Sequence, residues 1–417
     1  MVLTTQNPEL WADRFLKPMH NPSFVVPQFP QQPLTGRRDS RLSKLAAQFP
    51  WAAVPLIVSA PMRVMAGPKL AVAASTAGGL GFIGPGVKTA NMLSDLEEAS
   101  TLIKNSRLAS LGPTLKTLPV GVGFQVWSDD LDTATHAVRE FKPCVVWLFA
   151  PKEFTDLTIW SNTLRDVSPN SQIWIQVGTL SEVKRLLTMG TSTSTRDGPD
   201  AIVVQGSEAG GHGRASDGLG LVSLLPEAAD AVAASQTPEI PLLAAGGIAD
   251  TRGASAALCL GASGIVLGTR FLAATEARIS SGYQHEILRA DDGAVSTTRT
   301  LLYNHLRGIT TWPEEYSPRT IINQSFVEYR AGTAFEELKK RHDEHLQLGD
   351  AGWGPNGRLA TYAGASVGLI HEVKDAGDIV RDQGGREEDG SVYRLGETWC
   401  LRALYWRNNL PAFCSPY

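Results

Sequence analysis

One rhythm recurs along the middle of the chain, and it restricts the fold more than any other feature. A short apolar run, rich in β-branched residues, is followed by a turn signal and an amphipathic helical pattern. Eight runs follow this order: Pro55–Ala60, Leu80–Ile83, Val120–Phe124, Cys144–Phe149, Ile173–Val177, Ala201–Gln205, Pro241–Ala245 and Gly264–Leu267. Strands that are apolar on both faces and alternate with helices form parallel sheets. Eight such units predict an α/β fold closed into a (β/α)8, TIM-type barrel.

The barrel is expected to occupy residues 52–275 of the 417, which leaves a segment on either side. Residues 1–51 contain several prolines and little periodicity, so we expect an irregular N-terminal arm. Residues 276–417 are expected to form a mostly helical C-terminal extension that packs on the barrel and could act as a lid. The alternating charges of Ala334–His345 predict one of its helices, whereas the polar stretch Asp375–Gly396 is expected to be partly mobile.

Three of the connecting helices carry a recognisable start or stop signal. Ser128–Asp130 can cap a helix that runs to about Phe141, before Pro143 restarts the extended chain. Thr179–Glu182 resembles a capping box. The Ala-rich segment Asp250–Leu260 is followed by Gly261, which predicts a helix stop.

Charge and composition exclude several classes of protein. The chain has 38 basic and 42 acidic residues, so it offers no basic surface field for nucleic acid. It has no apolar stretch of the ~20 residues that a membrane span needs, and Met1–Phe15 lacks the pattern of a secretory signal. We therefore expect a cytoplasmic protein without nucleic acid or membrane partners, and leave open whether it forms an oligomer. The cysteines, Cys144, Cys259, Cys400 and Cys414, show no metal-binding spacing, and no metal is predicted.

The chemistry of such a barrel lies at the carboxyl ends of its strands, and the last two strands end in glycine-containing loops. The seventh run is followed by Gly246-Gly247 and the eighth by Gly268-Thr269. Glycine lets backbone N–H groups approach an anion closely, and these two loops form the common phosphate site of TIM barrels. We interpret the pair as a phosphate-binding site. The alternative for Gly246-Gly247 is a tight turn without a ligand.

A histidine stands among glycines after the sixth strand. The stretch Gln205–Gly213 reads QGSEAGGHG, which brings His212 to the barrel mouth without apolar neighbours. An imidazole with an ordinary pKa near 6.5 suits general acid–base catalysis. We predict that His212 is catalytic and that Glu208 is a structural acceptor for N–H groups of the loop.

Three further motifs need an interpretation. The small residues Ala60-Pro61-Met62 after the first strand suit a flat ring lying against the backbone, and a plain core turn is the alternative. The sequence Gly79–Gly84 spells GxGxxG but follows a helix pattern, so we reject it as a dinucleotide fingerprint. The pair His342 and His345 lies in a highly charged helix, where a solvated face is preferred over a metal site.

Together these motifs resemble the nitronate monooxygenase family, formerly called 2-nitropropane dioxygenases. The resemblance covers about residues 55–275 and rests on Ala60–Met62, Ser75–Phe82, Asp200–Gly213 and the two glycine loops. It implies an FMN-dependent (β/α)8 barrel in which His212 is the catalytic base. The expected cofactor-binding residues are Ala60, Pro61, Met62, Gln176, Gln205, Gly210, Gly211, Gly246, Gly247, Val266, Leu267, Gly268 and Thr269.

The chain departs from the family pattern at two positions. The family often has an asparagine after the Gly-Val pair of the third strand, where this chain has Gly123. Gln125 or Gln176 could supply the polar contact to the flavin that is lost there. Arg214 is also displaced by one position from the arginine of the family's histidine motif.

The resemblance implies the oxidation of alkyl nitronates, and in some cases of nitroalkanes, with O2 to a carbonyl compound and nitrite. The substrate is then a small molecule with an acidic carbon, and no metal is needed. Two alternatives stay open. An NAD(P)H-dependent flavin reductase of the enoyl-ACP reductase type shares the phosphate loops and a similar histidine, and a non-catalytic flavin-binding protein would share the cofactor alone.

Overall fold

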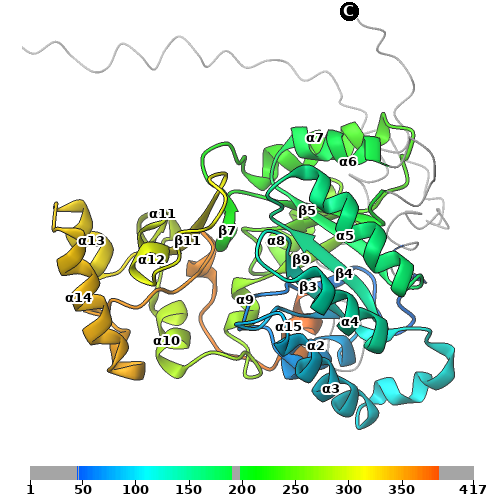
Figure 1. Ribbon diagram of the computed structural model, residues 1–417, viewed down its shortest axis with the longest axis horizontal. Coiled ribbons are helices and arrows are strands. Elements are labelled where there is room, and N and C mark those ends of the chain that lie inside the picture. Colours follow the sequence, from blue (N-terminus) through cyan, green and yellow to red (C-terminus); the bar gives the residue numbers. More distant parts are fainter. Residues whose placement is uncertain (1–44, 46, 190–197, 385–417) are drawn as a thin grey trace, which may run out of the picture. The chain divides into compact units, whose positions relative to one another are not determined.

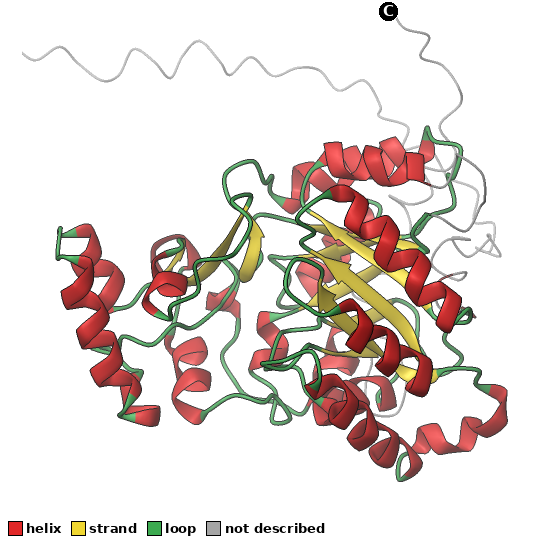
Figure 2. Cartoon of the chain, in the orientation of Figure 1, coloured by secondary structure: helices red, strands yellow, loops and turns green. Residues whose placement is uncertain are grey.

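Eight parallel strands close into a barrel in the computed structural model, as the eight apolar runs predict (Figures 1 and 2). In barrel order they are β1 (Leu56–Ser59), β2 (Leu80–Ile83), β3 (Leu118–Gln125), β4 (Pro143–Phe149), β5 (Gln172–Val177), β6 (Ala201–Gln205), β8 (Leu242–Ala245) and β9 (Gly264–Leu267). The structure describes residues 45, 47–189 and 198–384. The predicted arm therefore lies almost wholly outside the described residues, as do Cys400 and Cys414.

The barrel closes because β1 pairs in parallel with β9, with Leu56 opposite Gly264. Alternate residues of each strand point to opposite sides, so Leu56 and Val58 pack inside while Ile57 packs against the helices. Large aromatic side chains fill the interior: the rings of Phe82 and Trp147 meet edge to face at 5.2 Å. The interior is thus a packed core, which leaves room for a ligand only at an end of the barrel.

Helices connect the strands and bury one face each against them. They are α2 (Pro68–Thr76), α3 (Asn91–Lys104), α4 (Leu131–Phe141), α5 (Phe154–Val167), α6 (Leu180–Met189), α7 (Leu221–Ala233), α8 (Thr251–Cys259), the short α9 (Thr269–Leu272) and the 3-10 helix η2 (Arg107–Thr114). The predicted cap before α4 is confirmed, since the Asp130 carboxylate accepts from Thr133 N at 2.8 Å. Asp250 caps α8 in the same way and accepts from Arg252 N at 3.0 Å. These bonds satisfy N–H groups that a helix leaves unpaired at its start.

The extension contains helices α10 (Ser281–Arg289), α11 (Gly293–Ser296), α12 (Leu302–Leu306), α13 (Gln324–Arg330), α14 (Phe335–Leu346) and α15 (Ala376–Gln383), with 3-10 turns η3 (Gly349–Gly352) and η4 (Val367–Leu369). It also contributes two strands that the sequence did not predict, β10 (Thr297–Arg299) and β11 (Tyr316–Ile321). Both belong to a three-stranded antiparallel sheet whose third member is β7 (Gly211–Arg214). Because β7 follows β6, the extension is hydrogen-bonded directly to a barrel loop (Figure 2).

Two further contacts attach the extension to the barrel. The Arg278 guanidinium donates to both oxygens of the nearly buried Asp95 on α3, at 2.9 and 3.1 Å. Helix α15 packs on α2, and its Ile379 and Val380 are buried in the main core. The first part of the polar stretch Asp375–Gly396 is therefore ordered against the barrel, because its helix has an apolar face. The rest of the stretch, from residue 385 on, lies outside the described residues.

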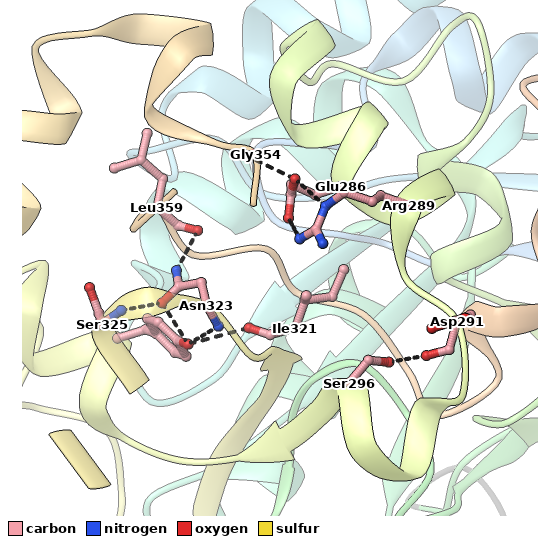
Figure 3. Close-up of polar contacts among 10 residues, drawn as sticks. Glu286, Arg289, Asp291, Ser296, Ile321, Asn323, Ser325, Gly354 and Leu359 are labelled. Atoms are coloured by element: carbon pink, nitrogen blue, oxygen red, sulfur yellow. Dashed lines mark hydrogen bonds and ion pairs between the residues drawn. The ribbon is translucent and has the colours of Figure 1, made fainter. Parts of the chain in front are cut away.

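Polar contacts fix the extension internally (Figure 3). The Asn323 side chain accepts from Ser325 N and donates to Leu359 O, both at 3.0 Å, so it caps α13 and ties it to a distant loop. Glu286 accepts from Gly354 N at 2.9 Å. On α14, His342 is only 3% exposed, so the interpretation of a wholly solvated face is wrong for this residue.

Candidate active site

A cavity of about 610 Å³ opens at the carboxyl ends of the barrel strands. Its volume lies in the range that small-molecule and cofactor sites usually have. The predicted site residues that line it are Ala60, Pro61, Met62, Gln176, Gln205, Gly210, Gly211, His212, Gly246, Gly247, Val266, Gly268 and Thr269. Leu267 does not line it, because its side chain is fully buried between the strands and the helices.

The two glycine loops form one wall of this cavity. Gly247 has φ +73°, a conformation that favours glycine, and a Cβ there would lie 3.1 Å from Glu208 Cβ. A Cβ on Gly268 would meet only the Met62 sulfur, at 3.9 Å, so that position faces open space. Among the turn and loop hydrogen bonds of the described residues, none is donated by the N–H of Gly247 or Gly268. These loops can therefore present backbone donors to an anion.

Glu208 holds the loop that carries the histidine. Its carboxylate oxygens both lie 3.0 Å from the N–H of Leu221, the first residue of α7. The predicted role of Glu208 as a structural acceptor is confirmed. Two arginines of the extension donate to carbonyl oxygens of the same loop: Arg299 to Ala209 O at 3.2 Å and Arg319 to Ser207 O at 3.2 Å. The loop is thus fixed from the barrel side and from the extension side.

His212 lies on β7, directly opposite Pro318 of β11. Its ring stacks on Trp312, with centroids 3.6 Å apart and planes 5° from parallel. Its Nε2 lies 2.9 Å from the side-chain nitrogen of Asn304 on α12. Pairing, stacking and this hydrogen bond together leave the imidazole one orientation in the cavity.

The surroundings of His212 favour its neutral form. Burial, together with the positive charges of Arg299 and Arg307, lowers the pKa of the imidazole from its ordinary value to about 3. The ring is therefore uncharged around neutral pH, and it is not the group titrating near pH 6.5 that the sequence alone suggests. A neutral imidazole has one donor nitrogen and one acceptor nitrogen.

Sequence reasoning missed the residues that the extension brings to the cavity. Arg307, Trp312, Tyr362, Gly364 and Ser366 all line it. The Gly364 N–H donates to Thr269 Oγ1 at 2.9 Å, which joins the extension to one of the glycine loops. The one available signal was Trp312, a large aromatic side chain in a mostly polar segment.

The departure from the family pattern at Gly123 has a steric cause. A Cβ at this position would lie 2.3 Å from the ring of Pro61, so no side chain fits. Of the two glutamines considered as substitutes, Gln176 lines the cavity and its Oε1 accepts from Trp147 Nε1 at 3.0 Å. Gln125 also lines it and accepts from Arg63 at 3.1 Å.

The described part of the chain contains no cluster of three or more His, Cys, Asp or Glu side chains that could hold a metal ion. Nor does any helix within the described ranges combine the length and apolar character needed to cross a membrane.

Comparison with known proteins agrees with the arrangement of this cavity. A family model described as nitronate monooxygenase matches residues 168–330, which include the histidine loop and both glycine loops. Nitronate monooxygenase npaC of Metarhizium robertsii is 53% identical over 340 residues, covering 81% of this chain and 92% of the relative. This chain belongs to the nitronate monooxygenase family. Nitronate monooxygenases of this family are flavin-dependent monooxygenases, so the chain is an oxidoreductase.

Further relatives support the assignment. A nitronate monooxygenase of Neurospora crassa is 36% identical over 358 residues, covering 82% of this chain and 91% of the relative. FabK from Thermotoga maritima is 24% identical with a TM-score of 0.60, over 81% of this chain and 94% of that one. A nitroalkane oxidase from Streptomyces ansochromogenes is 23% identical with a TM-score of 0.59, over 81% and 96%. Because both identities are below 25%, these two structures show only that the fold is shared.

Proposed function

We propose that this nitronate monooxygenase family member binds FMN and oxidises alkyl nitronates with O2 to a carbonyl compound and nitrite. The observation that carries the proposal is the cavity itself, in which His212 and the two glycine loops open onto the same space. One glycine wall suits one phosphate group, as FMN has, and no second nucleotide-binding fingerprint accompanies it in the sequence.

The residues of the cavity fit such a cofactor. Gly247 and Gly268 would hold the phosphate through N–H groups that make no turn or loop hydrogen bond in the described residues. Ala60, Pro61 and Met62 offer a flat, mostly apolar surface for the ring. When bound there, FMN would supply the redox chemistry that connects oxidation of the nitronate with reduction of O2. The residues of the cavity would bind and orient the substrate beside the flavin and enclose both.

Other residues of the same cavity can receive a small anionic substrate. His212 is held against Trp312 with one ring nitrogen toward Asn304. Arg307 lines the same space and donates to the Tyr362 hydroxyl at 2.7 Å, which places a positive charge at the mouth. Charge-assisted hydrogen bonds from such groups strengthen in a cavity shielded from water.

An anaerobic titration of the purified protein tests the proposal. Propyl-nitronate should bleach the flavin absorbance stoichiometrically, and NADPH added to a separate sample should not. Denaturation should release a chromophore with the mass of FMN. Bleaching by NADPH alone would favour the reductase alternative, and bleaching by neither would favour a non-catalytic flavin-binding protein.

A further inference from the structure

Two pairs of an indole and an amide lie in the barrel interior, one near each end of β5. Trp174 of β5 packs inside the barrel, so Gln172 and Gln176, two residues to either side of it, face the same way. Trp147 Nε1 on β4 donates to Gln176 Oε1 at 3.0 Å, and Trp174 Nε1 donates to Gln172 Oε1 at 2.8 Å. Of these four side chains, Trp147 and Gln176 line the cavity and the other two do not.

The chemistry of the indole leaves the Gln176 amide one orientation. An indole N–H only donates hydrogen bonds, so the amide atom that faces Trp147 must be the oxygen. Turning the amide by half a rotation would bring its N–H groups against the indole N–H and would leave buried donors unpaired, which costs free energy. The amide nitrogen of Gln176 therefore points away from Trp147.

Trp147 is held firmly enough to impose this orientation. Its side chain is 2% exposed, and its strand is paired on both sides, with Gly123 of β3 and Trp174 of β5 directly opposite. The ring meets Phe82 edge to face, and the centroid of Trp174 lies 6.2 Å away. The packed interior of the barrel thus fixes the indole, and the indole fixes the amide.

The nitrogen of the Gln176 amide is available to a ligand. Nε2 makes no hydrogen bond with another described residue, and it is not one of the buried polar atoms that lack a partner there. It therefore keeps accessible surface in the cavity that Gln176 lines. Because an amide nitrogen only donates, the group that binds there has to be an acceptor, such as a carbonyl oxygen.

We propose that Trp147 is a positioning residue that turns the Gln176 amide so that its N–H groups donate to a carbonyl oxygen of the flavin ring. The flavin ring carries carbonyl oxygens on one edge and methyl groups on the opposite edge. The pair therefore selects which edge of the ring lies beside β5, and it does so from the barrel interior. This inference rests on the proposed function, because it takes flavin as the ligand.

The hydrogen bond itself can be tested whether or not flavin is bound. In protein labelled with ¹⁵N-tryptophan, the indole signal of Trp147 is the one lost in Trp147→Phe. This signal should move to lower proton frequency in Gln176→Met, which has no oxygen to accept the indole N–H, and the signal of Trp174 should move much less. An unchanged Trp147 signal in Gln176→Met would overturn the proposal.

Two substitutions of Gln176 test which end of the amide faces the flavin. Gln176→Glu keeps an acceptor for Trp147 but has no N–H group, so it should weaken FMN binding about three- to tenfold, as Gln176→Met should. Fluorescence titration with FMN measures both. If the amide oxygen faced the flavin instead, Gln176→Glu would bind FMN like the wild type, and that outcome contradicts the proposal.

An infrared signature separates a lost hydrogen bond from an effect of the new charge. With FMN labelled with ¹³C at its carbonyl positions, the stretching band of one carbonyl should move to higher wavenumber in both Gln176→Glu and Gln176→Met, because a hydrogen bond to its oxygen is lost. Carbonyl bands that stay in place in both variants would show that the amide does not donate to the flavin.

A double-mutant cycle separates orientation of the amide from packing of the core. Trp147→Phe frees the amide to turn, so it should weaken FMN binding and shift the same carbonyl band. In the Gln176→Met background it should add no further loss, since no amide is left to orient. A loss that stays as large in that background would show that Trp147 acts through packing alone, against the proposal.

Trp174→Phe is the matched control, because it removes the same kind of bond from the same interior cluster but at Gln172, outside the cavity. It should leave both the FMN affinity and the carbonyl bands unchanged. A wild type that binds no FMN would overturn the proposed function and this inference with it. A wild type that binds FMN with carbonyl bands indifferent to Gln176 would overturn this inference alone, so the two failures are distinguishable.

Discussion

At the scale of single residues, His212 couples the site to the stability of the fold. Its pKa is lowered to about 3 in the folded protein, so the folded ring stays neutral where the unfolded ring takes up a proton. The contribution of the neutral ring to the free energy of unfolding is fully present above the ordinary pKa near 6.5 and is lost as the pH falls toward 3.

We therefore expect His212→Asn to flatten the pH dependence of unfolding. The wild type should lose on the order of 1–2 kcal/mol of this contribution between about pH 7 and about pH 5. Urea denaturation of both proteins at the two pH values measures it. If the variant loses as much stability as the wild type, the imidazole is not the group responsible.

Gly268 gives a clean test of the phosphate loops. Its backbone has φ −106°, which any residue adopts, and a side chain there would point into open space. Gly268→Val should therefore fold normally yet lose most of its flavin, because its methyl groups would occupy the place of the phosphate. Flavin content per polypeptide after gel filtration reports the effect.

Gly247→Val tests the second loop but adds backbone strain, since its φ is +73°. Gly332, with φ +90° and open space around an added Cβ, provides the control for strain outside the cavity. Flavin loss in Gly247→Val but not in Gly332→Val would assign the effect to the site. Full flavin content in both Gly247→Val and Gly268→Val would mean that the phosphate lies elsewhere.

The sequence predicted the cofactor side of the cavity better than the substrate side. Gly247 and Gly268 follow strands whose apolar runs are continuous, so the topology of the barrel brings them together. Asn304 and Trp312 reach His212 from a short helix and a loop, about which local propensity says nothing. Their positions depend on tertiary packing of the extension, which no periodicity encodes.

At the scale of elements, the connection from β6 to α7 depends on one carboxylate. Glu208 bonds the N–H of Leu221 and lies against Gly247, so it joins the histidine loop, a helix start and a glycine loop. Glu208→Ala should destabilise the protein by about 1–3 kcal/mol, because it leaves a partly buried N–H group unpaired. It should also weaken flavin binding.

Thermal unfolding and flavin titration measure both effects. Glu227→Ala, an exposed position on α7, serves as the control and should change neither. Full stability together with full flavin affinity in Glu208→Ala would remove Glu208 from its structural role.

The small antiparallel sheet could not be predicted from patterns in the sequence. The eight barrel strands were predictable because apolar runs buried on both faces are distinctive. Strand β7 has the sequence Gly-His-Gly-Arg, which has little intrinsic β-propensity, and β11 contains Pro318. Both are strands because each provides the other with backbone partners, with Tyr316 opposite Arg214. Such strands depend on pairing over a long sequence separation.

At the scale of the whole molecule, the extension and the barrel share an ion pair. Arg278 bonds both oxygens of Asp95, which is 6% exposed. Arg278→Ala would leave that carboxylate without its hydrogen-bond donor, so we expect a loss of about 1–3 kcal/mol in the free energy of unfolding. Adding Asp95→Asn should recover part of the loss, because it removes the unpaired charge.

A double-mutant cycle by chemical denaturation measures the coupling between the two residues. Additive effects of the two substitutions would show that the pair does not link extension and barrel energetically.

The pairing of β7 with β11 also sets an order of events during translation. A nascent chain has all eight barrel strands once Leu267 has emerged, but the partner of the histidine strand ends only at Ile321, and Tyr362 follows later still. A chain that ends before Ile321 therefore has all eight barrel strands but lacks the complete strand that pairs with β7, so this pairing would not hold His212 in place.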